Sequence, residues 1–152
     1  MSRFSKIVRM RVLAAAAFAL TVGFVAAGQS SYSTADYVGT WHWMFQGKAF
    51  ATMEIEQHGD QLTGSLTGVS LEMDDNGKLT KAVATDGPSS TLHVSLESGV
   101  LRVSEKDGND EIAWTMTLTS TKTGELRFAG GAPANAEAIK LEKLWSEPPV
   151  QN

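Results

Sequence analysis

Cysteine is absent from the chain of 152 residues. A disulfide, a thiol nucleophile and a lipid anchor on cysteine are therefore excluded. The folded state has to be stabilised by its hydrophobic core alone. A long helix is not predicted either, because no stretch of the mature sequence repeats its apolar residues with helical period.

Positive charge is scarce outside the N-terminus. Residues 1–27 contain four of the 13 Lys and Arg residues and none of the 17 acidic residues, so the rest of the chain has a net charge of −8. No stripe of Lys and Arg remains there. Nucleic acids and anionic membranes both require clustered positive charge, so neither is expected as a partner.

The first residues are typical of a secretory signal peptide. A basic, acid-free opening precedes an apolar run over residues 12–27, and small residues follow where a signal peptidase cuts. We expect cleavage after Ala27 or after Gly28. The alternative is an uncleaved membrane anchor, but the run of about 16 residues is shorter than the ~20 that span a bilayer. The sequence therefore predicts a secreted or periplasmic protein that does not insert into a membrane after processing.

The remaining chain has the length of one domain. Residues 28–35 are small and polar and predict a flexible N-terminal arm. Residues 36–146 are predicted to form a β-barrel domain, and residues 147–152, which include two adjacent prolines, a C-terminal tail. We expect a monomer.

About nine or ten short segments are predicted to be strands, and several of them have the alternation of half-buried strands. Turn residues separate them, among them Asn76-Gly77, which is a strong hairpin signal. The predicted strands are about 40–45, 49–57, 61–69, 70–73, 78–85, 91–97, 100–105, 110–120, 125–128 and 137–144. This regular spacing predicts an all-β fold, either an antiparallel up-and-down barrel of 8–10 strands or a β-sandwich. Closure is favoured because it removes exposed strand edges.

The first predicted strand is the most distinctive stretch. Trp41, Trp43 and Phe45 recur at every second residue, so all three point to one face, which has to be buried. With Asp36 and Gly39, Trp41 completes a D-x-x-G-x-W motif that resembles the start of the calycin group, which comprises lipocalins, fatty-acid-binding proteins and avidin-like barrels. The resemblance implies an antiparallel barrel that the tryptophan closes at one end.

The residues that follow look most like the helix-free avidin type, over roughly residues 36–68. Residues 59–64 read G-D-Q-L-T-G and resemble its Gly-rich L-T-G strand. The two helices of fatty-acid-binding proteins have no counterpart, because only residues 46–48 follow the first strand. Biotin binding is not implied: the avidin pattern has Asn and Ser after its Trp and a Tyr after the L-T-G glycine, and this chain has His42, Trp43 and Leu66 instead.

Four large side chains are the predicted ligand-binding residues, namely Trp41, Trp43, Met53 and Trp114. They are expected on the apolar faces of their strands, and ligand pockets are mostly apolar with a few polar anchors. The alternative is that they fill the interior as plain core, since an eight-stranded barrel is only just wide enough for side chains or one small ligand.

No catalytic signature is present, so we predict a protein that is not an enzyme. The sequence has no G-x-S-x-G serine, no glycine-rich phosphate loop and no indication of paired carboxylates in a cleft. The three histidines share no metal-ligand spacing, although His42 could meet Glu54 or Glu56 across the first hairpin. The acidic run over residues 105–111 lacks the spacing of a calcium loop. No metal site or cofactor is predicted.

Two functions remain open. The first is an exported, bacterial-type lipocalin-like barrel that binds a small hydrophobic ligand. The second is a solid barrel that contacts another exported protein through the arm over residues 29–35 or a strand edge. The second resembles the small barrel inhibitors of secreted proteases, whose N-terminal arm enters the enzyme cleft. Phe50, out of phase with Met53 and Ile55, is a predicted contact point for such a partner.

Overall fold

A computed structural model describes residues 32–130 and 135–145 of the chain. The predicted signal peptide, the first part of the predicted arm and the predicted tail lie outside the described residues. Within them, one short helix and ten strands follow one another. Their bounds are α1 Thr34–Tyr37, β1 Gly39–Phe45, β2 Lys48–His58, β3 Gln61–Leu66, β4 Val69–Met73, β5 Leu79–Ala84, β6 Ser90–Glu97, β7 Val100–Asp107, β8 Asp110–Leu118, β9 Thr123–Gly130 and β10 Ile139–Lys143.

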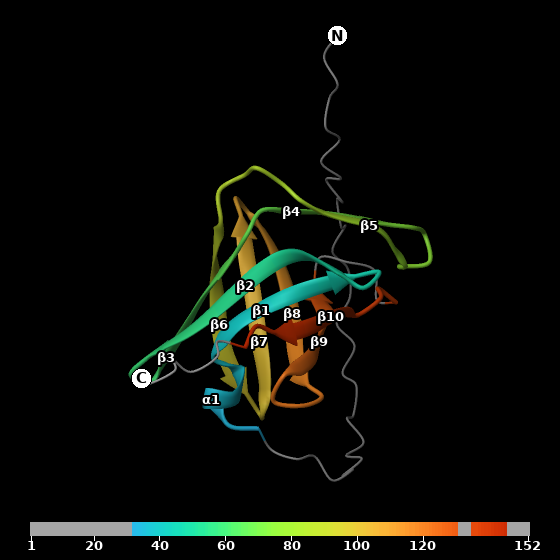
Figure 1. The fold of residues 1–152 in the computed structure, drawn as a ribbon. Helices are drawn as coiled ribbons and strands as arrows, with labels where there is room; N and C mark the ends of the chain where they lie inside the picture. Colours follow the sequence, from blue (N-terminus) through green and yellow to red (C-terminus); the bar gives the residue numbers. More distant parts are fainter. Residues whose placement is uncertain (1–31, 131–134, 146–152) are drawn as a thin grey trace, which may run out of the picture. The chain divides into compact units, whose positions relative to one another are not determined.

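Eight of the strands form one closed antiparallel barrel, in the order β1-β10-β9-β8-β7-β6-β3-β2. Pairing of β1 with β10 joins the first barrel strand to the last, with Trp43 opposite Leu141. Figure 1 shows these strands wrapped around a common interior. The predicted all-β antiparallel barrel is therefore confirmed, and the alternative of a β-sandwich is not what the chain forms.

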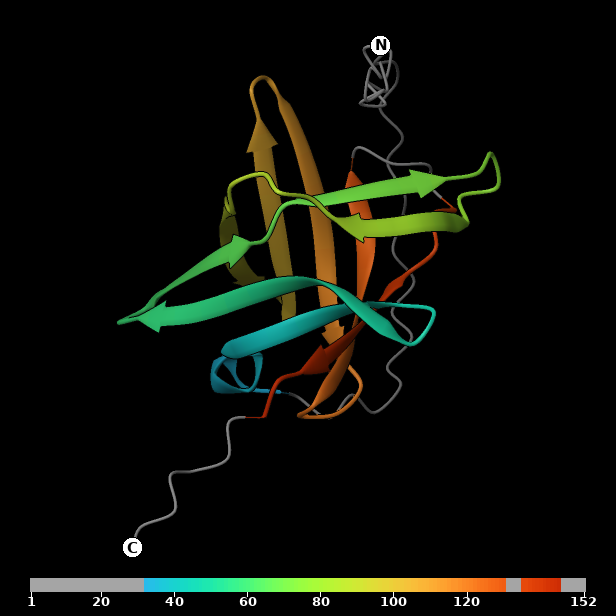
Figure 2. The same ribbon diagram turned by 45° about the horizontal axis from the view of Figure 1, so that its top comes forward.

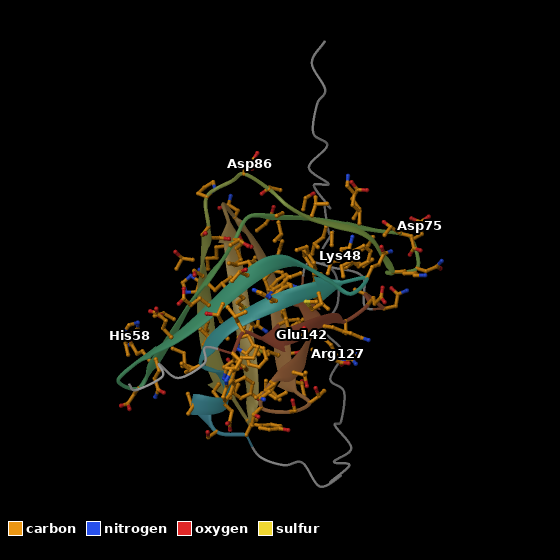
Figure 3. All side chains as sticks on the ribbon, viewed as in Figure 1. Lys48, His58, Asp75, Asp86, Arg127 and Glu142 are labelled. Carbon is orange, nitrogen blue, oxygen red and sulfur yellow. The ribbon has the colours of Figure 1, made fainter. Side chains whose placement is uncertain are left out.

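The inward faces of the barrel strands make one continuous core. Alternation along each strand decides which residues take part, because neighbouring side chains point to opposite faces. Trp41, Trp43 and Met53 are 0% exposed, and Trp114 is 2% exposed. Polar and charged side chains lie mostly on the outside, as Figure 3 shows for His58 at the end of the β2–β3 hairpin and for Arg127 on β9.

The remaining strands, β4 and β5, pair only with each other and form a separate two-stranded sheet. Figures 1 and 2 show this hairpin lying across the end of the barrel opposite α1. Val69 and Leu71 pack against the core from its inner face, and Leu79 is buried. We refer to residues 69–84 as the roof. Ten strands were predicted, but their separation into a barrel and a roof was not.

The short helix α1 lies at the other end of the barrel (Figure 1). The carboxylate of Asp36 accepts hydrogen bonds from the backbone N–H and the hydroxyl of Ser33, at 2.8 and 3.0 Å. These two bonds fix the start of the helix, which begins inside the stretch predicted as a flexible arm. Tyr32 is partly buried and packs against the core.

Candidate ligand-binding site

The four predicted ligand-binding residues all lie inside the barrel, at two levels. Trp41 on β1 is the register partner of Met53 on β2. Trp43 lies two residues further along β1, and its ring contacts Trp114 of β8 at a centroid distance of 5.4 Å. The structure therefore brings Trp43 and Trp114 together, and it places Trp41 nearer the α1 end.

Trp41 closes the α1 end, and its indole N–H is hydrogen-bonded within the chain. Its indole N–H donates to the backbone carbonyl of Tyr37 at 2.8 Å. The ammonium of Lys143 lies 5.2 Å from the centroid of the Trp41 ring and donates to the carbonyl of Asp36 at 2.9 Å. Gly39 has φ of +134°, and a Cβ there would lie 2.7 Å from Cε of Lys143. The positive φ gives the glycine of the D-x-x-G-x-W motif its structural reason, because other residues rarely adopt it, whereas the end of the Lys143 side chain could shift.

Burial at the α1 end also shifts the pKa values of Tyr37 and Lys143. Desolvation raises the pKa of the Tyr37 hydroxyl, and the nearby charges of Asp36 and Tyr32 raise it further. Desolvation lowers the pKa of Lys143, and Asp36 opposes this change. Both residues serve packing and hydrogen bonding here, because their polar atoms are already used within the chain.

Four aromatic rings form a row in the half of the barrel nearer the roof, and we call them the aromatic cluster. Trp43 lies edge-on to Phe50 at 6.2 Å and to Trp114 at 5.4 Å. Phe128 of β9 lies 5.9 Å from Trp114. These geometries are those that aromatic pairs prefer, and each pair contributes about 0.5–1.5 kcal/mol beyond burial of its area.

A β-bulge places Phe50 in this cluster. Trp43 pairs with Ala51 and Met44 with Ala49, which leaves Phe50 as the extra residue of β2. An extra residue breaks the strict alternation of a strand and re-aims a side chain. Phe50 therefore packs against the core and is partly buried, and its role as a contact point for a partner stays a prediction. Sequence alternation could not reveal this, whereas Phe128 lies in phase with Leu126 and was recognisable as inward.

The indole N–H groups of Trp43 and Trp114 are buried and have no hydrogen-bond acceptor among the described residues. An unpaired buried donor costs about 1–3 kcal/mol, because the group loses its bond to water on folding. Two such donors in contacting rings are unusual in a native core. They are the feature of the barrel interior that the packing of the chain does not explain.

The roof is held at its tip by the segment that precedes β10. The Glu137 carboxylate accepts from the backbone N–H of Leu79 at 3.0 Å, and the N–H of Glu137 donates to the carbonyl of Gly77 at 2.7 Å. Asn135 donates its amide to the carbonyl of Asn76 at 2.6 Å. Gly77 has φ of +77°, and a Cβ there would lie 2.7 Å from the Asn135 carbonyl oxygen. We refer to these contacts as the latch.

Two surface depressions lie at opposite ends of the barrel. The larger, of about 590 Å³, lies beside Thr34 of α1 and is floored by Leu62, Val94 and Leu96. The smaller, of about 310 Å³, lies at the base of the roof. Its lining includes Leu66, residues 67–68, Thr85 and residues 87–89. None of the four predicted ligand-binding residues lines either depression.

Ionisable side chains form no further site in the part of the chain that the structure describes. No group of three or more His, Asp or Glu side chains is placed there to hold a metal ion. The register sets His42 opposite Thr52 and Glu142 rather than Glu54 or Glu56. His58 contacts Glu56 at 3.0 Å on the exposed surface. None of the helices among the described residues has the length and apolar character to cross a bilayer.

Comparison with known proteins gives no relative: the chain matches no protein-family model, no curated protein and no solved structure. The calycin resemblance of residues 36–68 therefore stays a prediction. The barrel itself rests on the strand pairing described above.

Proposed function

We propose that this protein is an exported lipocalin-like barrel that binds a small hydrophobic ligand inside the half covered by the roof. A closed eight-stranded barrel is just wide enough to hold one small ligand. The aromatic cluster supplies an apolar surface with two polar anchors, the composition typical of ligand pockets. Export is proposed from the basic opening and apolar run of residues 1–27.

The observation that carries this proposal is the pair of unpaired indole donors at Trp43 and Trp114. A barrel that served only as a solid scaffold could be packed with apolar side chains that bury no N–H group, and it would then avoid the cost of two unpaired donors. A bound molecule with an acceptor atom would accept hydrogen bonds from these two indole N–H groups. Since Trp43 is fully buried, the ligand reaches it when the roof and the half-buried Phe50 move aside.

Tryptophan fluorescence tests the proposal directly. Trp145 is 64% exposed and would dominate the response of the protein to solvent, so the measurement uses the Trp145→Phe variant, which leaves only the three buried tryptophans. We expect saturable quenching or a spectral shift on titration with compact aromatic molecules, and none with polar molecules of the same size. A fluorescence signal unchanged by every apolar probe would contradict interior binding.

The filled interior favours a second function, a solid barrel that contacts another exported protein. Trp41, Trp43 and Met53 have no exposed surface, as expected of plain core. Residues before Tyr32 would make the contact, in the manner of the barrel inhibitors of secreted proteases. Inhibition of a panel of secreted proteases tests this, with a variant lacking residues 28–31 as the control. That variant keeps Ser33 and Asp36, which fix α1. Equal inhibition by both proteins would contradict a role for the arm.

A further inference from the structure

The two unpaired indole donors cannot satisfy each other. The rings of Trp43 and Trp114 meet at 73° with centroids 5.4 Å apart, so the edge of one faces the plane of the other. In this arrangement at most one N–H can point at a ring face, and an N–H contact to a ring is weaker than a bond to oxygen. At least one donor is therefore not satisfied by the other indole, and neither has a conventional hydrogen-bond acceptor among the described residues.

The charge around these donors restricts the acceptor they can bind. The core cluster consists of apolar and aromatic residues, and Ser104 is the one buried polar residue of the described chain. Lys143 lies at the α1 end and is engaged by Asp36 and Trp41. A carboxylate moved into this interior would lose its hydration without gaining a counter-ion, whereas a neutral carbonyl loses far less. The surroundings select against an anion.

We propose that Trp43 and Trp114 donate their indole N–H groups to the oxygen of a small, planar, neutral carbonyl compound, such as an aryl ketone, ester or amide. The flat ring system of the ligand would lie within the aromatic cluster, against Phe50 and Phe128, where ring contacts are favourable. This inference rests on the proposed function and adds to it the chemical class of the ligand and the two atoms that recognise it.

Three matched probes test the inference with the purified protein. Acetylnaphthalene has the neutral carbonyl, ethylnaphthalene has nearly the same shape without an acceptor, and naphthoate carries a carboxylate. One or two hydrogen bonds predict that acetylnaphthalene binds about three- to thirtyfold more tightly than ethylnaphthalene. Naphthoate should bind most weakly at neutral pH. Tighter binding of naphthoate than of the ketone would overturn the neutral class.

Nuclear magnetic resonance of the indole N–H groups identifies the donors in the unaltered chain. On addition of acetylnaphthalene the Trp43 and Trp114 signals should move downfield, as expected for new bonds to oxygen. The Trp41 signal is the internal control, because its N–H is already bonded to the Tyr37 carbonyl. The inference is overturned if both naphthalenes bind equally and neither signal moves, an outcome that leaves the proposed function standing. If no probe binds at all, the proposed function falls with it.

Variants test recognition through the ratio of the affinities for acetylnaphthalene and ethylnaphthalene. A loss of stability affects both affinities of a variant alike, so the ratio reports recognition of the carbonyl. Trp114→Phe should reduce the preference for acetylnaphthalene over ethylnaphthalene to nearly one, and Trp43→Phe should act in the same direction. Trp41→Phe is the matched control and should leave the ratio unchanged, because the Trp41 donor is used inside the protein. An unchanged ratio in both Trp114→Phe and Trp43→Phe would contradict the assignment even if one of the variants folds poorly.

Discussion

The two ends of the barrel each bury a tryptophan of β1, but the two indole N–H groups differ in their hydrogen bonding. Trp41 and Trp43 are two residues apart on β1, face the same interior and are equally buried. At the α1 end, the Trp41 N–H donates to the Tyr37 carbonyl, and the Lys143 ammonium lies over the Trp41 ring. At the roof end, the Trp43 N–H has no acceptor among the described residues. The hydrogen bonds at the first end are complete, whereas the second end has buried indole donors that no described residue uses.

The largest expected effect is at the closed end. Trp41→Ala removes a fully buried ring and the donor to Tyr37, so the free energy of unfolding should fall by about 3–5 kcal/mol. Urea denaturation measures it. Trp145→Ala is the control, because that ring is 64% exposed and its loss should change stability by no more than about 0.5 kcal/mol. Equal losses in the two variants would remove the case for Trp41 as the closing residue.

A matched pair of milder substitutions compares the two ends directly. Trp41→Phe and Trp43→Phe each keep an aromatic ring in the core. Trp41→Phe also leaves the Tyr37 carbonyl without its donor, while Trp43→Phe removes a donor that has no acceptor in the described chain. Trp41→Phe should therefore cost about 1–2 kcal/mol more than Trp43→Phe in urea denaturation. A larger cost at Trp43 would mean that its N–H is satisfied in solution.

The latch stabilises the roof against local opening, separately from the unfolding of the barrel. Glu137→Ala removes the acceptor for the Leu79 N–H, so that amide should exchange its hydrogen roughly two- to tenfold faster. Glu137→Gln retains an oxygen at the same place and should stay close to the unaltered protein. Hydrogen exchange is the measurement, with amides of β8 as the internal reference. If Leu79 and β8 exchange equally faster, the substitution has destabilised the whole barrel rather than the roof.

The smallest expected effects are changes in the stability of the protein at alkaline pH, caused by Lys143 and Tyr37 at the α1 end. The pKa of Lys143 lies below its ordinary 10.5 in the folded state, chiefly through desolvation. The folded protein therefore loses this proton first, and stability should rise as pH climbs through the folded pKa towards 10.5. Tyr37 acts oppositely: its pKa is raised above 10.0, so its contribution is full below pH 10.0 and is lost as pH passes the raised value.

Urea denaturation midpoints measured from neutral pH to about pH 11 would distinguish the contributions of the two residues to stability. The pH at which each contribution changes is expected to within about one unit. Relative to Lys143→Met, the unaltered chain should gain stability as pH rises. Relative to Tyr37→Phe, it should lose stability above pH 10.0. Parallel profiles for all three proteins would show that neither group changes its pKa on folding.

Alternation made most of the fold predictable. The period of two in β1, β2 and β8 identified Trp41, Met53 and Trp114 as inward residues, and all are buried. The ten predicted strands overlap the ten observed ones. Closure was expected from the cost of free edges, and the register between β1 and β10 provides it.

The parts that escaped prediction depend on contacts between distant residues. Phe50 lies in the cluster because of a bulge, which shifts the alternation that the prediction used. The roof is separate because β3 pairs with β6, a choice that no local signal specifies. The latch joins Leu79 to Glu137, and the unpaired state of two indole groups follows from everything that surrounds them. Local sequence carries none of this information.

The pairing of β3 with β6 also makes the roof a replaceable module. Leu66 and Ser90 are register partners on neighbouring strands, so the chain leaves and re-joins the barrel at the same place. Thr67 still continues the β2 ladder, because its N–H donates to the Thr52 carbonyl and its hydroxyl accepts from the Thr52 N–H, each at 3.0 Å. The register pairs of the eight barrel strands do not include residues 68–89. Descendants of this sequence can therefore exchange the segment for another of different length and chemistry while the scaffold keeps its pairing. In such a lineage, the length and sequence of the roof can diverge faster than the barrel.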